Sequence, residues 1–455
     1  MNDIIPKIPA PLDPGFQPAA LVNRRYLQAL RPPVPLVLAL EGENGRVTRF
    51  ETSVSADADA ATLQYVERTV KFLLWARGGW KLFVGGPPAI GRFIQQTYSA
   101  HGHRKFDVGM MTQSYGKKFQ VVVTTVGKVP AGKEIQTAVG GHLKGCRIGF
   151  DLGASDYKVS AVIDGQAIFT EEMPWDPKTQ ANPEYHYHHL SSALHRAAAH
   201  LHRVDAIGGS SAGIIVNNEI RLASLLRAIP PNLHRQAAGM FKRLAKEWRV
   251  PLVVMNDGDV TALAGALSLN ATGMLGVAMG SSEAGGFMDK HGRVLGWLYE
   301  LAFAAVDYNP AATAEEWSGD RGVGALYFSQ QAVNKLLPAA GIELPPAMGL
   351  PERLQKVQEL MAQDDPRAAK IYETIGVYLG YSIPHYADFY DFSHMLILGR
   401  VTTGKGGDIV LAKAREVLRA EFPEVAGQIK LHVPDEKSRR IGQAVAAASL
   451  PALSQ

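Results

Sequence analysis

Short apolar runs alternate along the chain with longer segments in which apolar residues recur every three or four positions. The runs predict strands and the longer segments predict amphipathic helices, because side chains repeat about every 2 residues in a strand and about every 3.6 in a helix. Strands are expected within 34–42, 80–86, 119–126, 146–165, 204–213, 251–257, 273–294 and 393–398, and helices near 59–77, 89–100, 188–203, 233–248 and 405–418. Strands that alternate with helices predict a mixed α/β fold.

Proline and glycine divide the chain into segments. Residues 1–35 hold eight prolines, which restrict the backbone and remove N–H donors, so we expect an extended arm that lies over the body and outside the core. A Gly- and Lys-rich stretch at 130–145 predicts a boundary. We therefore expect an N-terminal α/β region of unknown role at 36–145, then two lobes with related strand–turn–strand patterns at 146–255 and 256–455, the C-terminal helix returning to the first lobe.

The composition limits the class of protein. A chain of 455 residues that is 46% hydrophobic can fill the cores of two or three domains. The chain has 47 Lys and Arg and 43 Asp and Glu, which give a formal charge of +4, and it contains no run of basic residues. Its charge therefore does not indicate a nucleic-acid partner. The single cysteine, Cys146, excludes an intrachain disulfide and a zinc cage of thiolates. Because no apolar stretch approaches the roughly 20 residues of a membrane span, we expect a cytoplasmic protein that binds no membrane.

An aspartate ends the apolar strand at 146–151, and a turn of small residues follows it. Small residues let backbone N–H groups approach a phosphate closely, while a carboxylate at the strand end can hold a hydrated Mg²⁺. Asp151 would be that carboxylate, with Gly153, Ala154 and Ser155 in the turn. An ordinary β-hairpin with a glycine turn explains this stretch at least as well. The stretch alone therefore does not establish a phosphate site.

Two further turns of small residues lie between predicted elements, at 278–286 and 399–404. A nucleotide held between two lobes needs a phosphate loop from each lobe and a third glycine-rich loop beside the adenosine. Between the first two loops, the strand "VVMND" ends at Asn256 and Asp257, where a carboxylate could take the proton of a hydroxyl that attacks phosphorus. Asp257 is the candidate base; alternatively, Asp257 or Asp259 merely caps the following helix.

The order of these segments resembles one family. "GFDLGASDYKVSAV", "GGSSAG", "VVMNDGDVTALAGAL", "LGVAMGSSEAGGFMDKHG", "YELAF" and "LILGRVTTGKGGD" resemble the ROK family of bacterial sugar kinases and related regulators, within the actin-like ATPase superfamily, over about residues 146–450. The resemblance implies a two-lobed RNase H-like sugar-kinase fold, to which the N-terminal α/β region is an addition. It also implies that ATP and Mg²⁺ bind between the lobes.

The resemblance implies roles for individual residues. Asp151 falls on the aspartate that is linked to the metal, through water. Asn256 and Asp257 fall on an Asn–Asp pair whose Asn binds a sugar hydroxyl and whose Asp is the base. Glu300, in "YELAF", falls on a sugar-binding glutamate. Further implied substrate contacts are Ser211, Ala212 and Gly213, and the implied ATP contacts are Gly153, Ala154, Ser155, Lys158, Gly280, Ser281, Ser282, Gly399, Thr402, Thr403 and Gly404.

Departures from the family pattern concern zinc and the substrate. Phe303 stands where the family has a histidine that contacts the sugar and helps to hold zinc, and residues 318–329 resemble the Cys-rich zinc segment without its cysteines. No zinc is therefore expected. Ala325 occupies the place of a second sugar-binding glutamate, so the far end of the substrate site is expected to be roomier, less polar and less discriminating.

Other clusters have plainer explanations. The six histidines within 186–202 would spread around several faces of a helix, which disfavours a zinc site. Trp175, Trp297 and Tyr299 are expected in the core rather than stacked on a sugar. The pair Asp320 and Arg321 is most simply an ion pair at the surface or between lobes.

These observations favour an ATP-dependent, Mg²⁺-requiring, glucokinase-like enzyme that phosphorylates a hydroxyl of a hexose or similar polyol. The alternative is a sugar-sensing regulator or a catalytically silent sugar-binding protein. Regulators of the family carry an N-terminal helix-turn-helix, whereas residues 36–130 alternate strands with helices, and the presence of Asp257 also favours an enzyme. The sequence leaves open which sugar is used, whether the chain forms a homodimer and whether another phosphoryl donor replaces ATP.

Overall fold

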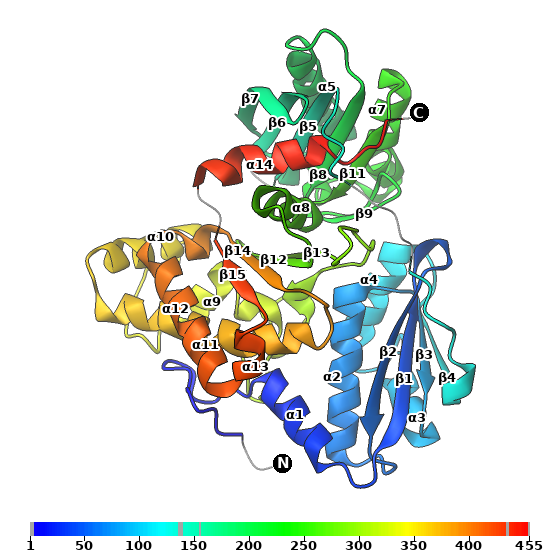
Figure 1. The fold of residues 1–455 in the computed structure, drawn as a ribbon, viewed down its shortest axis with the longest axis vertical. Coiled ribbons are helices and arrows are strands. Elements are labelled where there is room, and N and C mark those ends of the chain that lie inside the picture. The colour runs from blue at the N-terminus through cyan, green and yellow to red at the C-terminus, as the bar shows by residue number, and fades with distance from the viewer. Residues whose placement is uncertain (1–3, 135–139, 154–155, 434–435, 454–455) are drawn as a thin grey trace. The chain divides into compact units, whose positions relative to one another are not determined.

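The computed structural model describes residues 4–134, 140–153, 156–433 and 436–453. The chain divides into two compact units, the first comprising Met1–Ile135, Val277–Gly285 and Gly296–His432, and the second Gln136–Gly276, Gly286–Leu295 and Val433–Gln455. Figure 1 shows the elements of each.

Helices and strands of the first unit come from both ends of the chain. They are α1 (Ala19–Ala29), β1 (Val34–Glu41), β2 (Val47–Val54), α2 (Ala60–Arg77), β3 (Lys81–Gly85), α3 (Pro88–Thr97), α4 (Lys105–Tyr115), β4 (Gln120–Thr124), α9 (Gln330–Leu336), α10 (Leu350–Ala362), α11 (Pro366–Ala387), β14 (His394–Leu398), α12 (Lys405–Glu421), α13 (Pro423–Ala426) and β15 (Lys430–His432). The strands β12 (Met274–Met279) and β13 (Glu283–Met288) contribute residues to both units.

The second unit is built mainly from the middle of the chain. It contains β5 (Cys146–Leu152), β6 (Asp156–Ile163), β7 (Gln166–Pro174), α5 (Pro183–Ala198), β8 (Ala206–Ser211), β9 (Ile214–Val216), β10 (Glu219–Leu222), α6 (His234–Ala238), α7 (Met240–Trp248), β11 (Leu252–Asn256), α8 (Asp257–Leu269) and α14 (Glu436–Ala448).

The sheet of the second unit has the strand order β11-β8-β5-β6-β7. β5 pairs in parallel with β8 and antiparallel with β6, and every residue of β5 is buried. The helix α14 packs closely against β5 and β8 (Figure 1). A Cβ added at Gly149 or Gly208 would clash with the backbone of α14 at Ala444 or Ala447, so glycine at both positions permits this close approach.

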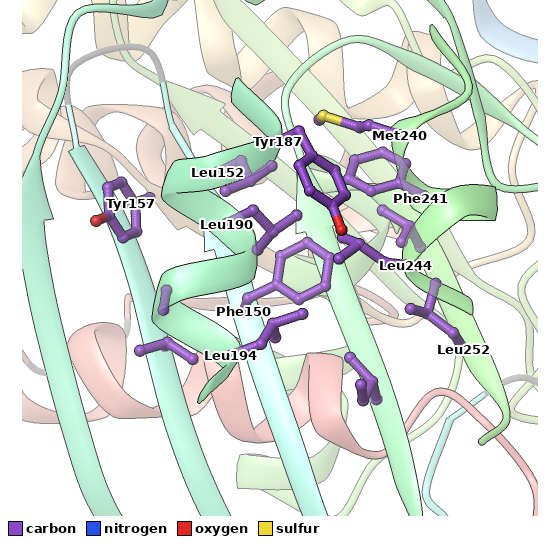
Figure 2. Packing of buried hydrophobic residues seen from close by; sticks show 14 of the residues in the cluster. Phe150, Leu152, Tyr157, Tyr187, Leu190, Leu194, Met240, Phe241, Leu244 and Leu252 are labelled. Carbon is purple, nitrogen blue, oxygen red and sulfur yellow. The ribbon is translucent and has the colours of Figure 1, made fainter. Parts of the chain in front are cut away.

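The hydrophobic core of this unit holds the strand ends in place. Figure 2 shows Phe150 and Leu152 of β5 packed among Leu190 of α5 and Phe241 and Leu244 of α7. Burying a side chain of this size contributes roughly 1.5–3 kcal/mol. The C-terminal end of β5, where Asp151 lies, is therefore fixed by packing on its neighbours.

Among the described residues there are also a two-stranded sheet, β10-β9, and two four-stranded sheets. The N-terminal sheet has the order β2-β1-β3-β4, with α2 packed against β1 and α3 against β4 (Figure 1). The predicted helix near 59–77 is confirmed as α2, which begins where the Asp59 carboxylate accepts the backbone N–H of Thr62 at 2.7 Å. The other sheet has the order β13-β12-β14-β15.

The expectation of an extended N-terminal arm outside the core is wrong for much of its length. Residues 19–29 form α1, in which Tyr26 is buried. Phe16 is 2% exposed, and its ring centroid lies 4.8 Å from that of Tyr378 in α11. Prolines restrict the backbone before Pro18, but they do not prevent a helix from starting after it.

Several elements differ from the sequence prediction. α4 and β7 were not expected, and α5 begins at Pro183 rather than near 188. The helix expected at 233–248 is interrupted at Gly239, which separates α6 from α7. Across the described residues, no helix combines the length and the apolar character that crossing a membrane requires.

Candidate functional site

Asp151 lies at the end of β5 among polar groups of three strands. It faces Lys158 in the register of β6, and Ser210 of β8 donates its hydroxyl to Asp151 Oδ1 at 2.6 Å. The aspartate is 8% exposed, and burial raises the pKa of its carboxyl to about 6, an effect to which the charge of Asp257 adds. The structure therefore places Asp151 close to the candidate base.

Gln443 of α14 connects these two aspartates. Its Nε2 atom lies 3.4 Å from Asp151 Oδ1, 3.2 Å from Ser210 Oγ and 3.4 Å from the backbone carbonyl oxygen of Asp257. One amide thus bonds the end of β5 to the first turn of α8. Sequence reasoning missed Gln443, since no local pattern in the last helix singles it out.

Asp257 is the first residue of α8 and is partly buried. Its Oδ1 atom accepts the backbone N–H of Gly258 at 3.0 Å. Burial raises the pKa of its carboxyl above the ordinary value, against a smaller lowering by that N–H group. None of the ion pairs found between described residues involves Asp257. The carboxylate is thus available to accept a proton.

Asn256 caps α8, so the alternative that Asp257 or Asp259 caps the helix is wrong. Its Oδ1 atom accepts the backbone N–H of Gly258 at 2.8 Å, and its Nδ2 atom donates to the carbonyl oxygen of Gly213 at 2.8 Å. The amide therefore fixes two parts of the site while retaining a second N–H. Its predicted bond to a sugar hydroxyl stays a prediction.

The other predicted substrate contacts of this unit follow β8. Gly213 has a φ of +102°, and a Cβ there would clash with the carbonyl oxygen of Leu222, so this turn requires glycine. Ala212 is partly exposed, and its N–H donates to the carbonyl oxygen of Leu152 at 3.1 Å. Ser211 is fully buried. Of these three residues, Ala212 and Gly213 are partly exposed and Ser211 is not.

The first predicted phosphate turn is partly described. The N–H of Gly153 donates to the carbonyl oxygen of Asp156 at 3.0 Å, and its carbonyl accepts the indole N–H of Trp175 at 2.9 Å. Ala154 and Ser155 lie outside the described residues. Lys158 Nζ lies 3.4 Å from Asp156 Oδ1. Trp175 is 7% exposed, which confirms its place in the core, and its N–H positions Gly153.

The second and third predicted turns lie side by side in the first unit. The N–H of Gly280 donates to the carbonyl oxygen of Ser282 at 3.0 Å, and both Ser281 and Ser282 are exposed. Gly399 has a φ of +108°, and a Cβ there would clash with the backbone of Met279. The two turns approach closely because Gly399 has no side chain.

The third turn leads into the N-terminus of α12. The hydroxyl of Thr402 donates to the carbonyl oxygen of Gly399 at 3.0 Å, and that of Thr403 donates to Arg400 at 2.8 Å. Gly404, with a φ of +67°, is the N-cap, and a Cβ there would meet no atom within 4 Å. Gly404 and Lys405 are thus exposed at the start of this helix, whereas Gly406 and Gly407 are buried; a helix N-terminus favours an anion.

The N-terminal region packs directly on the segment that contains Glu300. The N–H of Glu300 donates to the carbonyl oxygen of Trp75 in α2 at 2.9 Å. Phe303 is 9% exposed, and its ring centroid lies 4.4 Å from Trp75, 5.8 Å from Phe106 and 5.5 Å from Trp317. Aromatic rings of the N-terminal region therefore pack around Phe303, and the expectation of a roomier, less discriminating end of the substrate site stays a prediction.

The predicted ion pair between Asp320 and Arg321 is also corrected. Asp320 is buried and pairs with Lys71 at 3.1 Å and with Arg104 at 2.5 Å. Burial raises the pKa of Asp320, but these two cations outweigh it and lower the pKa below its ordinary value. The guanidinium of Arg321 instead donates to the carbonyl oxygen of Ala312. Asp320 thus attaches the 318–329 segment to the N-terminal region.

The prediction that zinc is absent stays a prediction. In the described part of the chain, no group of three or more His, Cys, Asp or Glu side chains is arranged to hold a metal ion. The histidine-rich helix contains the buried His186, whose Nε2 atom lies 2.8 Å from the carbonyl oxygen of Leu225.

Comparisons with known proteins identify the fold of the chain. No protein-family model matches the sequence, and no curated protein matches it. Among solved structures, a ROK hexokinase from Thermus thermophilus is 20% identical with a TM-score of 0.51, over 67% of this chain and 98% of its own. A ROK family protein from Streptococcus pneumoniae TIGR4, in complex with sucrose, is 14% identical with a TM-score of 0.51, over 66% of this chain and 97% of its own.

A third match is a ROK family transcriptional regulator, a homolog of the E. coli MLC protein. It is 16% identical with a TM-score of 0.53, over 80% of this chain and 88% of its own. Matches at these identities establish the fold, which kinases and a regulator share. The chain therefore has the mixed α/β fold of the ROK proteins, as the order of its sequence motifs predicts.

Proposed function

We propose that the chain is an ATP-dependent kinase of a hexose or similar polyol, with Asp257 as the general base. The observation that carries this proposal is the pair of carboxylates, Asp151 and Asp257, joined through Gln443 in one desolvated part of the second unit. A phosphotransferase needs one carboxylate for the metal and one for the hydroxyl proton. The pair supplies both.

The residues present fit Mg²⁺ and a nucleotide. Mg²⁺ is commonly held by one or two carboxylates together with phosphate oxygens and water, and the Asp151 carboxylate is held in a fixed orientation by Ser210. The turn before α12 ends at the exposed Gly404, and the positive end of the helix dipole there suits phosphate. When bound, Mg-ATP supplies the phosphoryl group.

The chemistry assigned to the chain is proton transfer. Asp257 accepts the proton of the substrate hydroxyl, and its raised pKa makes it a stronger proton acceptor than an exposed aspartate. Asn256 holds the turn at Gly213 and, with its second N–H, can bind a hydroxyl of the same substrate. Gln443 keeps the first turn of α8 at the end of β5 and acts as a positioning residue.

The test is ADP release by the purified full chain with Mg-ATP and a panel of hexoses and polyols. Asp257→Asn should keep the fold and the affinity for ATP but lower turnover by about 10²- to 10⁴-fold. Asp57→Asn, at an exposed aspartate, is the matched control and should turn over at the normal rate. If Asp257→Asn retains activity within a few fold, the base lies elsewhere.

A sugar-sensing regulator is the second candidate, and the share of this chain that one structural match covers favours it. The match to the transcriptional regulator covers 80% of this chain, whereas the match to the hexokinase covers 67%. A sensor would bind a sugar without releasing ADP. Calorimetric binding of a sugar by a chain that shows no turnover with any donor would therefore support this candidate over the kinase.

A further inference from the structure

Two histidines join neighbouring strands of the sheet β13-β12-β14-β15, in which β14 and β15 lie side by side (Figure 1). His394 Nδ1, on β14, lies 2.9 Å from His432 Nε2, on β15, and the two ring planes differ by 19°. Both rings are partly exposed. One nitrogen donates a hydrogen to the other, because two bare nitrogens or two N–H groups would repel each other at this distance.

The strand β15 is weakly attached to the rest of the first unit. It contains three residues, none of which is buried, and it lies at the end of the strand order, where it pairs in parallel with β14. Arg415 of α12 adds one bond, with Nη2 3.4 Å from the carbonyl oxygen of Leu431. A short strand with little buried surface opens locally at low cost. The histidine pair is therefore an important part of its attachment.

The charges around the two rings are positive. Lys430 faces His394 in the register of the strands, and Lys430 and Arg415 both act on His432. Burial lowers the pKa of each imidazole, and the neighbouring basic groups lower it further. No carboxylate is among the described groups that act on either ring, and β12, the other neighbour of β14, has no titratable side chain. Both rings are therefore mostly neutral at pH 7.

The bond between the rings tolerates one additional proton but not two. The outer nitrogen of the donor ring can take the first proton, which leaves the shared hydrogen in place. Only the acceptor nitrogen can take the second, which brings two N–H groups and two positive charges face to face beside Lys430. The doubly protonated pair therefore repels itself and pushes β15 away from β14.

We propose that His394 and His432 form an acid-sensitive clamp, which holds β15 to β14 near neutral pH and releases β15 when both rings are protonated. His432 is the last residue of the first unit, and the chain continues from Val433 into the second. Release of β15 would thus free the segment by which the chain leaves the first unit. The clamp is independent of the proposed kinase activity.

The sign of the pH dependence follows from linkage. The pKa values of both imidazoles are lower with the strand in place than in an exposed histidine, so the released strand binds protons more readily than the clamped one. The clamp is therefore fully effective above the ordinary histidine pKa of about 6.5. It weakens as the pH falls below that value, by up to about tenfold in the opening equilibrium per pH unit for each extra proton.

The measurement is amide hydrogen exchange of the full chain, followed by mass spectrometry at pH 7 and pH 5 and corrected for the intrinsic effect of pH on exchange. The amides of 430–432 should exchange at least about tenfold faster at pH 5 than at pH 7. The amides of β12, in the same sheet, should change by less than about twofold.

Two variants replace a facing nitrogen with a neutral amide. His432→Gln places the amide near the position of Nε2 and His394→Asn places it near Nδ1, so each keeps a hydrogen bond and removes one of the two positive charges. In either variant the corrected exchange of β15 should differ by less than about twofold between the two pH values, and His394→Asn decides the matter if His432→Gln does not fold. His234→Gln, at an exposed histidine of α6, is the matched control and should keep the wild-type response to acid.

The proposal fails if β15 of the wild type exchanges at the same corrected rate at both pH values. It also fails if both variants open in acid as the wild type does, or if acid speeds exchange in β12 as much as in β15. Either of these last results would assign the opening to groups other than the two histidines.

Discussion

A buried glutamate in β13 should make the stability of the protein depend on pH in an unusual direction. Glu283 is 2% exposed, its Oε1 atom accepts the hydroxyl of Tyr386 at 3.0 Å, and its Oε2 atom is buried with no partner in the described structure. Burial raises the pKa of its carboxyl to about 8, although the Tyr386 hydroxyl lowers it somewhat. The folded protein therefore holds Glu283 in its neutral form at pH 7.

The sign and the size of the effect follow from linkage. Because the pKa is higher in the folded state than the ordinary 4.5, the stability that the neutral form provides is complete below pH 4.5 and is lost as the pH rises toward 8. Each pH unit in this window removes about 1.4 kcal/mol, so the loss reaches about 3 kcal/mol at pH 7. Glu283→Gln keeps an acceptor for Tyr386 and removes the ionisation.

The measurement is denaturant unfolding of the wild type and of Glu283→Gln at pH 5, 7 and 8. The variant should match the wild type within about 1 kcal/mol at pH 5 and exceed it by about 3 kcal/mol at pH 7, with a larger gain at pH 8. Glu316→Gln, at an exposed glutamate, should change stability by less than about 0.5 kcal/mol throughout. A difference between Glu283→Gln and wild type that does not vary with pH would refute the reasoning.

Three further predictions concern packing, charge and the metal. Gly149→Ala forces α14 away from β5 and should lower the free energy of unfolding by about 1–3 kcal/mol or more. Gly109→Ala lies inside a helix, where a Cβ meets nothing within 4 Å, and should raise the free energy of unfolding by about 0.5–1 kcal/mol. Urea titration of both variants checks this, and equal effects of the two substitutions would contradict it. Asp320→Asn removes one of the buried carboxylates that pair with Lys71 and should lower the free energy of unfolding by about 3–5 kcal/mol. A decrease of less than about 1 kcal/mol in the same assay would show that the ion pairs of Asp320 contribute little to stability. Asp151→Asn should weaken the response of activity to Mg²⁺ and leave calorimetric sugar affinity nearly unchanged; lost sugar binding with a normal Mg²⁺ response would reverse that assignment.

Strands β5, β6, β8 and β11 of the second unit and the position of Asp151 were predictable because their signals are local. Each strand is a short apolar run that ends at a polar or small residue, and parallel strands bring such ends to one edge of a sheet. Asp151 and Ser210 meet at neighbouring positions of β5 and β8 for this reason. The same logic placed Asp257 after the apolar run of β11, where it is the first residue of α8, and Gln443 contacts both Asp151 and the backbone carbonyl of Asp257.

Features that depend on distant partners were not predictable. Gln443 reaches Asp151 across 292 positions of sequence, and nothing in the pattern of α14 indicates which of its residues faces β5. Helix α4 was missed because its buried face includes the polar residues Asp107 and Ser114, which weakens the apolar periodicity. An aspartate was the alternative cap of α8 because Asn and Asp are equally good caps, and only the geometry identifies Asn256 as the cap.

The N-terminal region is an integral part of the first unit rather than an appended module. Its helix α2 supplies the carbonyl oxygens that accept the N–H groups of Tyr299 and Glu300, and its Trp75 packs on Phe303. Lys71 of the same helix holds Asp320. Where the family resemblance implies a histidine and thiolates around zinc, this chain has stacked rings and buried ion pairs that join the 299–329 segment to α2. The interactions of α2 therefore restrain the 299–329 segment.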